Sequence, residues 1–391
     1  MHRKQREAIV GYLYVLPALL LIFIFHCIPI LMIFGLSLTK YNLIQPAKWY
    51  GLGNFSRMLS DPYVKDSLRN TVQYTLMVVP IQTIVALLIA AVLARYFRNR
   101  FGGFVKSCLF IPVVSSPVLV GTIWLFLLAT NGGTINQLLS LLGINPVNWI
   151  GSVSTALPSV SVATIWKNIG YFLVIFYAGI MDIPRSLFEA ARVDGATAIQ
   201  QFFYITLPML RPITVLVVTL GTIWSFQVFD IVYVMTNGGP GRSTLTLVLS
   251  VYNAAFREYR IRVCQCHSSV TLLCGYDSLL TTTKALWSRG RSGIMHKETS
   301  PRRVFLSIIL LFCALVATYP FIYMVLLSLT DSATVYVRLE DGISLVNYRR
   351  IQQNFSYLLH LMNSSIVAIA SCFLNGLLGS MAAFGFAKKK F

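Results

Sequence analysis

Runs of sequence without a charged side chain constrain this chain more than any other feature. One run covers residues 8–39, and no charged residue occurs between Ser107 and Trp166. A helix of about 20 apolar residues spans a bilayer core of about 30 Å, so each run is long enough to cross a membrane. The chain is 56% hydrophobic and only 12% charged, with a mean hydropathy of +0.70. This composition predicts an all-α, polytopic helical membrane protein.

The pattern of apolar runs predicts five spans followed by two more. The five cover residues 8–39, 70–94, 107–129, 156–181 and 211–235, and the later two cover 304–330 and 351–387. Residues 40–69 are expected to form an external loop. Lys167 falls inside the fourth span, where it either faces a cavity or a partner, or snorkels to the outer interface.

Basic residues give the chain a formal net charge of +19, and they gather at the ends of the apolar runs. Such placement predicts orientation in a lipid membrane, with a cytoplasmic N-terminus, so nucleic-acid binding is not expected. The seven cysteines lack the paired spacing of a zinc site or a disulfide framework, and no metal site is expected. Titratable residues within the spans are too scattered for a catalytic site, which argues against a membrane enzyme.

A polar stretch at residues 186–208, SLFEAARVDGATAIQQFFYITLP, lies between two apolar segments. Ser186 starts the spacing of a capping box, which predicts a helix beginning just after it. Gly195 can close that helix in the left-handed conformation, and Thr197 starts a second capping signature. Pro208 disfavours continuing the second helix. We expect a compact helix-turn-helix on the cytoplasmic side, suited to docking a partner protein.

This stretch resembles the EAA loop of the permease subunits of binding-protein-dependent ABC importers. The positions that carry the resemblance or are expected to act with it are Glu189, Ala190, Ala191, Asp194, Gly195, Ile205, Leu207 and Pro208. The resemblance implies the type I ABC importer permease fold in a bacterial cell membrane, with this loop as the coupling helix that sits in a cleft of a separate ABC ATPase subunit. It also implies a second permease subunit and an extracytoplasmic solute-binding protein.

The chain contains no G-x-x-x-x-G-K-[ST] phosphate loop. ATP is therefore expected to bind the partner subunit, and no cofactor is expected here. A secondary transporter or channel, which would need no ATPase, is the rival class. An ATPase gene beside this one would favour the importer.

The solute is suggested by a second resemblance. Residues 236–240, Thr-Asn-Gly-Gly-Pro, are similar to an outer loop of the carbohydrate-uptake branch of these permeases, the maltose and glycerol-phosphate type. This implies a sugar, oligosaccharide or polyol derivative, with another small solute as the alternative. In this family the helices flanking the coupling loop build the solute pocket, which makes candidates of Asn168, Tyr171, Trp224, Ser225 and Gln227. Aromatic faces pack on sugar rings and amides bond hydroxyls, but a helix-packing role is the alternative for each residue.

The opening of the chain is repeated after residue 294, because two spacings from its beginning recur there. In each copy a proline precedes a Ser-Leu-Thr triplet by eight residues. In each copy one asparagine also precedes a second asparagine by 16 residues. The first copy contains Pro29, Ser37, Asn54 and Asn70, and the second contains Pro320, Ser328, Asn347 and Asn363. Repetition in register predicts two related subunits.

The segment between the two copies does not fit either of them. A sixth span is expected after Phe256, but residues 261–294 contain no apolar run long enough to form one. Without that span, six lysines and arginines between residues 284 and 303 would lie outside the membrane, against the positive-inside bias. We hypothesise a first permease at 1–260, a shifted reading frame at 261–294, and the first two spans of a second permease at 295–391. A non-functional fusion is the alternative.

Overall fold

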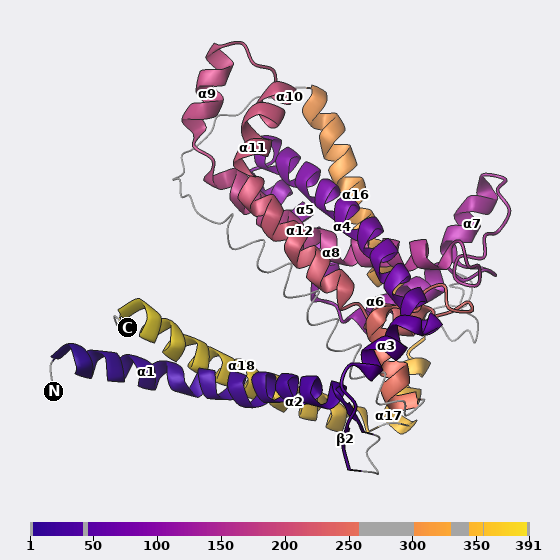
Figure 1. Ribbon diagram of the computed structural model, residues 1–391. Helices are drawn as coiled ribbons and strands as arrows, with labels where there is room; N and C mark the ends of the chain where they lie inside the picture. The colour runs from indigo at the N-terminus through magenta and orange to yellow at the C-terminus, as the bar shows by residue number, and fades with distance from the viewer. Residues whose placement is uncertain (1–2, 42–45, 258–300, 330–343, 355, 389–391) are drawn as a thin grey trace. The chain divides into compact units, whose positions relative to one another are not determined.

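The computed structural model describes the chain except for residues 1–2, 42–45, 258–300, 330–343, 355 and 389–391 (Figure 1). The chain divides into two compact units. Unit 1 consists mainly of residues 1–54 and 338–391, and unit 2 mainly of residues 55–327. Each unit is considered by itself below.

Unit 1 contains α1 (Arg3–Ile22), η1 (Phe23–Cys27), α2 (Ile28–Ser37), β1 (Thr39–Lys40), β2 (Lys48–Trp49), α17 (Val346–Asn354) and α18 (Tyr357–Lys388). The short helix α3 (Gly53–Ser60) leads from residue 54 into unit 2. Unit 2 contains α4 (Pro62–Tyr96), α5 (Arg100–Val114), α6 (Pro117–Leu127), α7 (Thr134–Leu141), α8 (Ala156–Asp182), α9 (Arg185–Val193), α10 (Ala198–Gln201), η2 (Phe202–Thr206), α11 (Leu207–Met209), α12 (Arg211–Phe226), α13 (Asp230–Met235), α14 (Leu247–Tyr252), η3 (Asn253–Arg257) and α16 (Pro301–Ser328).

In unit 1, α1 and α18 pack side by side (Figure 1). The rings of Tyr14 and Phe384 meet edge to face at 5.1 Å. A Cβ atom on Gly385 would lie 2.8 Å from a methyl carbon of Val15, so the glycine lets the two helices approach closely. The two short strands pair antiparallel, with Thr39 opposite Trp49.

Both copies of the predicted repeat make the same contact in unit 1. The Asn54 side chain donates from Nδ2 to the backbone carbonyl of Ser37 at 2.9 Å, and Asn347 donates from Nδ2 to the carbonyl of Ser328 at 3.3 Å. Each asparagine is the second residue of a short helix, α3 or α17, that follows a span. In each copy, an asparagine on the following helix thus donates a hydrogen bond to a backbone carbonyl at the end of the span.

Unit 2 holds two separate clusters of buried apolar side chains. The α9-end cluster includes Ala86, Leu93, Phe172, Phe176, Leu210 and Val217. The α13-end cluster includes Tyr74, Val78, Val120, Val160, Ile231 and Leu249. Because α4 and α8 contribute to both clusters, these two helices form the framework of the unit.

Five helices among the described residues are long and apolar enough to cross a membrane: Val10–Ser37, Pro62–Tyr96, Ala156–Asp182, Val304–Ser328 and Tyr357–Ala387. Counting two bent pairs as one span each gives up to seven. The predicted all-α polytopic class is therefore confirmed. The fourth span matches α8 closely, whereas the second begins earlier than predicted, at Pro62, because Asp61 caps the helix by accepting a hydrogen bond from the Tyr63 N–H at 2.9 Å.

The predicted third span at 107–129 is wrong as a single helix. Helices α5 and α6 meet at an angle of 101°, broken at Ser115 and Ser116. Both serines are extended, with ψ of 144°, because the residue before Pro117 is driven out of the helical region. The Ser116 hydroxyl then caps α6 by accepting from the Leu119 N–H at 3.2 Å.

The predicted fifth helix at 211–235 is also interrupted. Helix α12 ends at Phe226, and α13 begins at Asp230. Between them, the backbone of Phe229 has φ −138° and ψ −64°, which lie outside helical values. The Asp230 carboxylate lies in the first turn of α13, where its negative charge complements the helix dipole. Helical structure then resumes at Leu247, ahead of the expected position after Phe256. The hypothesised junction at 261–294 falls outside the described residues and stays a prediction.

Candidate functional site

The predicted helix-turn-helix forms, with one correction. Gly195 has φ +76°, the left-handed conformation expected of it, and ends the turn after α9. Both halves of the Thr197 capping box are present at the start of α10. The Ser186 box is wrong, because α9 begins two residues earlier than predicted, at Arg185, with Pro184 as N-cap and no side-chain cap.

The prediction that Pro208 ends the second helix is wrong. Helical turns continue from α10 through the π-helix η2 to Met209. At the end of η2 the Leu207 N–H donates to the Phe202 carbonyl, and this wider turn accommodates a proline at the next residue. The chain bends instead after Leu210, where α10–α11 and α12 meet at 68°.

The turn lies at one end of unit 2 (Figure 1) and presents most of its surface outward. Within this chain α9 has no buried residue, and Glu189, Ala190, Asp194 and Gly195 are exposed. Val193 is 89% exposed, and exposed apolar or aromatic side chains continue along the turn at Leu187, Ile199, Phe203 and Tyr204. Several exposed apolar side chains on one short segment are typical of a protein interface.

The other side of the turn is fixed to the bundle. Ile205 and Leu207, together with Phe188, pack against the α9-end cluster. Gln201 is 3% exposed; it donates to the Ala196 carbonyl and accepts from Arg95 on α4, both at 3.1 Å. The predicted coupling residues therefore fall into two groups, an exposed group on α9 and the Gly195 turn, and an anchoring group at 205–208.

Two arginines lie together at the base of the turn. Burial, and then the neighbouring Arg185 guanidinium, lower the pKa of Arg98 from its ordinary value. The Arg185 Nη1 atom is buried and has no hydrogen-bond partner in the described part of the chain. Positive charge therefore accumulates where α9 begins.

The structure brings two of the five predicted solute-pathway residues into contact. The rings of Tyr171 on α8 and Trp224 on α12 lie 5.0 Å apart. Ser225, the next residue, is 3% exposed. Asn168 lies one helical turn before Tyr171 and is half-buried, whereas Gln227 is exposed just beyond the end of α12.

Lys167 faces protein. Its Nζ atom donates to the Val113 carbonyl at 3.4 Å, in the last turn of α5 next to the break at Ser115. A cation near the C-terminal end of a helix is favoured by the helix dipole and pairs a carbonyl that the break leaves free. This supports the predicted alternative in which Lys167 faces the interior.

Sequence reasoning missed Gln82, which lies within the apolar α4 and is 0% exposed. Neither Nε2 nor Oε1 of its carboxamide has a hydrogen-bond partner among the described residues. Leaving such a group unpaired costs about 1–3 kcal/mol. The only carboxamide in the run VVPIQTIVALLIAAV, whose one other polar residue is Thr83, was the available signal, because polar residues inside spans are rare and tend to be functional.

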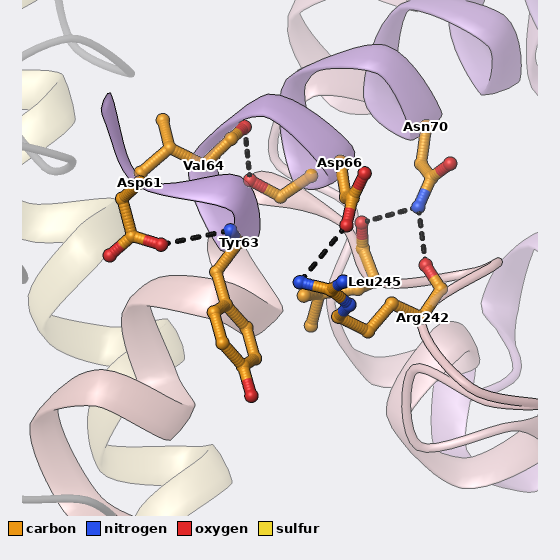
Figure 2. Close-up of polar contacts among 8 residues, drawn as sticks. Asp61, Tyr63, Val64, Asp66, Asn70, Arg242 and Leu245 are labelled. Carbon is orange, nitrogen blue, oxygen red and sulfur yellow. Dashed lines mark hydrogen bonds and ion pairs between the residues drawn. The ribbon is translucent and has the colours of Figure 1, made fainter. Parts of the chain in front are cut away.

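The loop after α13, which is expected on the outer side, is held to the start of α4 (Figure 2). Asn70 donates from Nδ2 to the carbonyls of Arg242 and Leu245, at 2.7 and 3.0 Å. The Arg242 guanidinium pairs with Asp66 at 3.1 Å and lies 4.8 Å over the Tyr63 ring. The loop therefore has a fixed position against α4.

The sequence matches known proteins across this region. Residues 74–276 match the family described as binding-protein-dependent transport system inner membrane component. The trehalose/maltose transport system permease protein MalF of Thermococcus litoralis is 35% identical over 251 residues, which cover 64% of this chain and 84% of that protein. The lactose transport system permease protein LacF of Rhizobium radiobacter is 36% identical over 258 residues, 65% of this chain and 86% of that protein.

A solved structure shows the same fold. A bacterial ABC transporter involved in the import of the acidic polysaccharide alginate contains a chain that superimposes with a TM-score of 0.61 at 21% identity. The match covers 71% of this chain and 96% of that chain. The predicted fold is thereby confirmed.

The Asn70 contacts generate a stability prediction. Asn70→Leu leaves the Arg242 and Leu245 carbonyls without their donor and should lower the free energy of unfolding by about 1–3 kcal/mol, measured by denaturant titration of the full chain in detergent. Asp66→Asn is the control, because it removes only an ion pair whose side chains are 40% and 43% exposed and should cost less than about 1 kcal/mol. Equal losses would contradict this account of the loop.

Proposed function

We propose the function of this chain from one premise: it belongs to the family of binding-protein-dependent transport system inner membrane components. It is therefore a multi-pass permease subunit of an ABC importer in the inner membrane, and not an enzyme. The proposals below concern its partners, its solute and its relation to a second permease.

The α9–α11 turn is the surface that engages a separate ABC ATPase. The observation that carries this proposal is the exposed apolar surface from Leu187 to Tyr204, which needs a partner to cover it. On the opposite side, Ile205 and Leu207 join the turn to the α9-end cluster, and Gln201 joins it to α4. A force on the exposed side would therefore move the bundle helices as well as the loop.

The solute is a sugar or a related polyhydroxylated molecule, delivered by an extracytoplasmic binding protein that docks on the outer loops. The relatives named for trehalose, maltose and lactose support this solute class. The paired rings of Tyr171 and Trp224 offer an aromatic face, and Asn168, Ser225 and Gln227 offer hydrogen bonds. The pinned outer loop of Figure 2 gives the binding protein a surface of fixed position.

The chain joins two permeases, with the first at 1–260, a frame-shifted junction at 261–294 and the opening of the second at 295–391. The repeated contact in unit 1 supports the relation, since Asn54 and Asn347 bond equivalent serine carbonyls after equivalent spans. Identical use of equivalent residues is what two copies of one fold would give. Residues 295–391 then correspond to the first two spans of the transporter's second permease subunit.

Coupling to the ATPase depends on the Gly195 turn. A Cβ on Gly195 would meet nothing within 4 Å, so substitution there acts through the backbone, whose φ is +76°. Gly195→Val strains that conformation and should reduce solute-stimulated ATP hydrolysis by the assembled complex about tenfold or more, whereas Gly195→Asn, which tolerates left-handed φ, should keep most of it. Full stimulation in the valine variant would count against the docking role.

Uptake of radiolabelled maltose, trehalose and lactose by cells carrying the complete transporter tests the solute class. We expect uptake of at least one of these sugars. Tyr171→Ala and Trp224→Ala should each reduce that uptake about tenfold or more, because each removes an aromatic face, while Tyr204→Ala on the coupling turn should leave sugar selectivity unchanged. Unchanged uptake in both pathway variants would remove these residues from the pocket.

The junction makes a prediction about the DNA. Translating the other two reading frames between codons 260 and 294 should reveal an apolar segment of about 20 residues, the length of a sixth span. If neither frame encodes such a segment, the fusion proposal fails. Resequencing this region from the native source is the measurement.

A further inference from the structure

A polar layer separates the two apolar clusters of unit 2. On α4, Val78 is the last residue of the α13-end cluster and Ala86 is the first of the α9-end cluster. Helix α8 leaves a comparable gap at residues 167–170, and on α12 the α9-end cluster stops at Leu220, so residues 221–227 lie beyond it. The polar residues in these gaps are Gln82, Thr83, Lys167, Asn168, Thr222, Ser225 and Gln227. The layer contains three of the five proposed solute-pathway residues and, in addition, two residues from α4, Gln82 and Thr83.

On α4, Gln82 is the residue of this layer that differs most from its neighbours. Its side chain is fully buried, yet neither carboxamide atom has a hydrogen-bond partner in the part of the chain that the structure describes. Thr83 beside it differs, because its hydroxyl donates to the Val79 carbonyl of its own helix. An amide that served only to join two helices would be expected to pair across their interface.

The carboxamide faces α12 at a glycine. A Cβ on Gly221 would lie 2.6 Å from Nε2 of Gln82, so only a residue without a side chain leaves the amide its present space. Ser225 lies one turn further along the same face of α12 and is buried too. Its neighbour Trp224 contacts Tyr171, so the amide adjoins the segment of α12 that carries the proposed aromatic face.

We propose that Gln82 is a solute-contacting residue of the transport pathway, whose carboxamide bonds hydroxyl groups of a polyhydroxylated solute when α4 and α12 separate. The inference rests on the proposed sugar-import function and adds to it a residue on a third helix. A glutamine side chain offers two N–H donors and a carbonyl acceptor, which matches hydroxyl groups that both donate and accept. In the packed state described here these groups have no partner, so opening of the α4–α12 interface supplies bonds that the closed interface lacks.

Two measurements on the full chain separate this role from a structural one. Gln82→Leu should leave the thermal unfolding midpoint in detergent unchanged or raise it, because it removes an unpaired buried amide. The same variant should reduce uptake of the transported sugar, taken from maltose, trehalose and lactose, about tenfold or more in cells carrying the complete transporter. Thr83→Val is the matched control, since its hydroxyl pairs within α4, and it should leave uptake within about twofold of the unmodified chain.

Gly221→Ala provides a second variant that keeps the glutamine. The added methyl group displaces Nε2, the flexible end of the side chain, so uptake should fall at least about threefold. Gly103→Ala, at a helical glycine with nothing within 4 Å of the added atom, is its control and should preserve uptake.

A lowered midpoint in Gln82→Leu would assign the residue to structure and overturn the proposal, and so would undiminished sugar uptake. If the unmodified transporter takes up none of the three sugars, the sugar proposal fails. In that case the Gln82 proposal, which requires a polyhydroxylated solute, fails with it, whereas undiminished sugar uptake in Gln82→Leu beside an active unmodified transporter overturns the Gln82 proposal alone. The two failures are therefore distinguishable.

Discussion

Hydrogen bonding inside an apolar bundle is the constraint on which the rest of this structure depends. Lipid offers no partners to backbone groups, so each break in a spanning helix must be satisfied by protein. At the α5–α6 break, Ser116 caps one helix and Lys167 donates to a carbonyl of the other. At the ends of two spans, Asn54 and Asn347 pair serine carbonyls in the same way. Polar side chains in this chain thus stabilise irregular backbone as well as serving transport.

The same constraint gives meaning to the position of the polar layer. Two apolar clusters hold α4 and α8 together at either end, and the residues between them include the proposed solute pathway. Apolar packing at both ends keeps the bundle intact when helices shift, whereas an unpaired amide such as Gln82 weakens the middle. Low stability in the layer is what the proposed opening of the α4–α12 interface would require.

The α9–α11 turn is exposed on one side and packed against the helix bundle on the other. Its exposed side, around Val193, leaves apolar surface for a partner. Its buried side, through Gln201 and Leu207, is joined to α4 and to the α9-end cluster. The left-handed Gly195 fixes the direction in which α9 leaves the bundle. In the proposed importer, this arrangement would let a short loop transmit movement to the helices that carry the proposed solute-pathway residues.

The sequence by itself determined the features that depend on neighbours along the chain. Long apolar runs fixed the membrane class and the position of α8, and local capping chemistry fixed the Gly195 turn and the Thr197 box. Prediction failed where a local signal had competitors: Pro184 displaced the Ser186 cap, and a π-helical turn carried the chain through Pro208. Only the tertiary structure decided the partner of Lys167, the division of 205–208 from α9, and the burial of Gln82 against Gly221. These depend on which helices meet and at what height, and hydropathy along one chain does not contain that information.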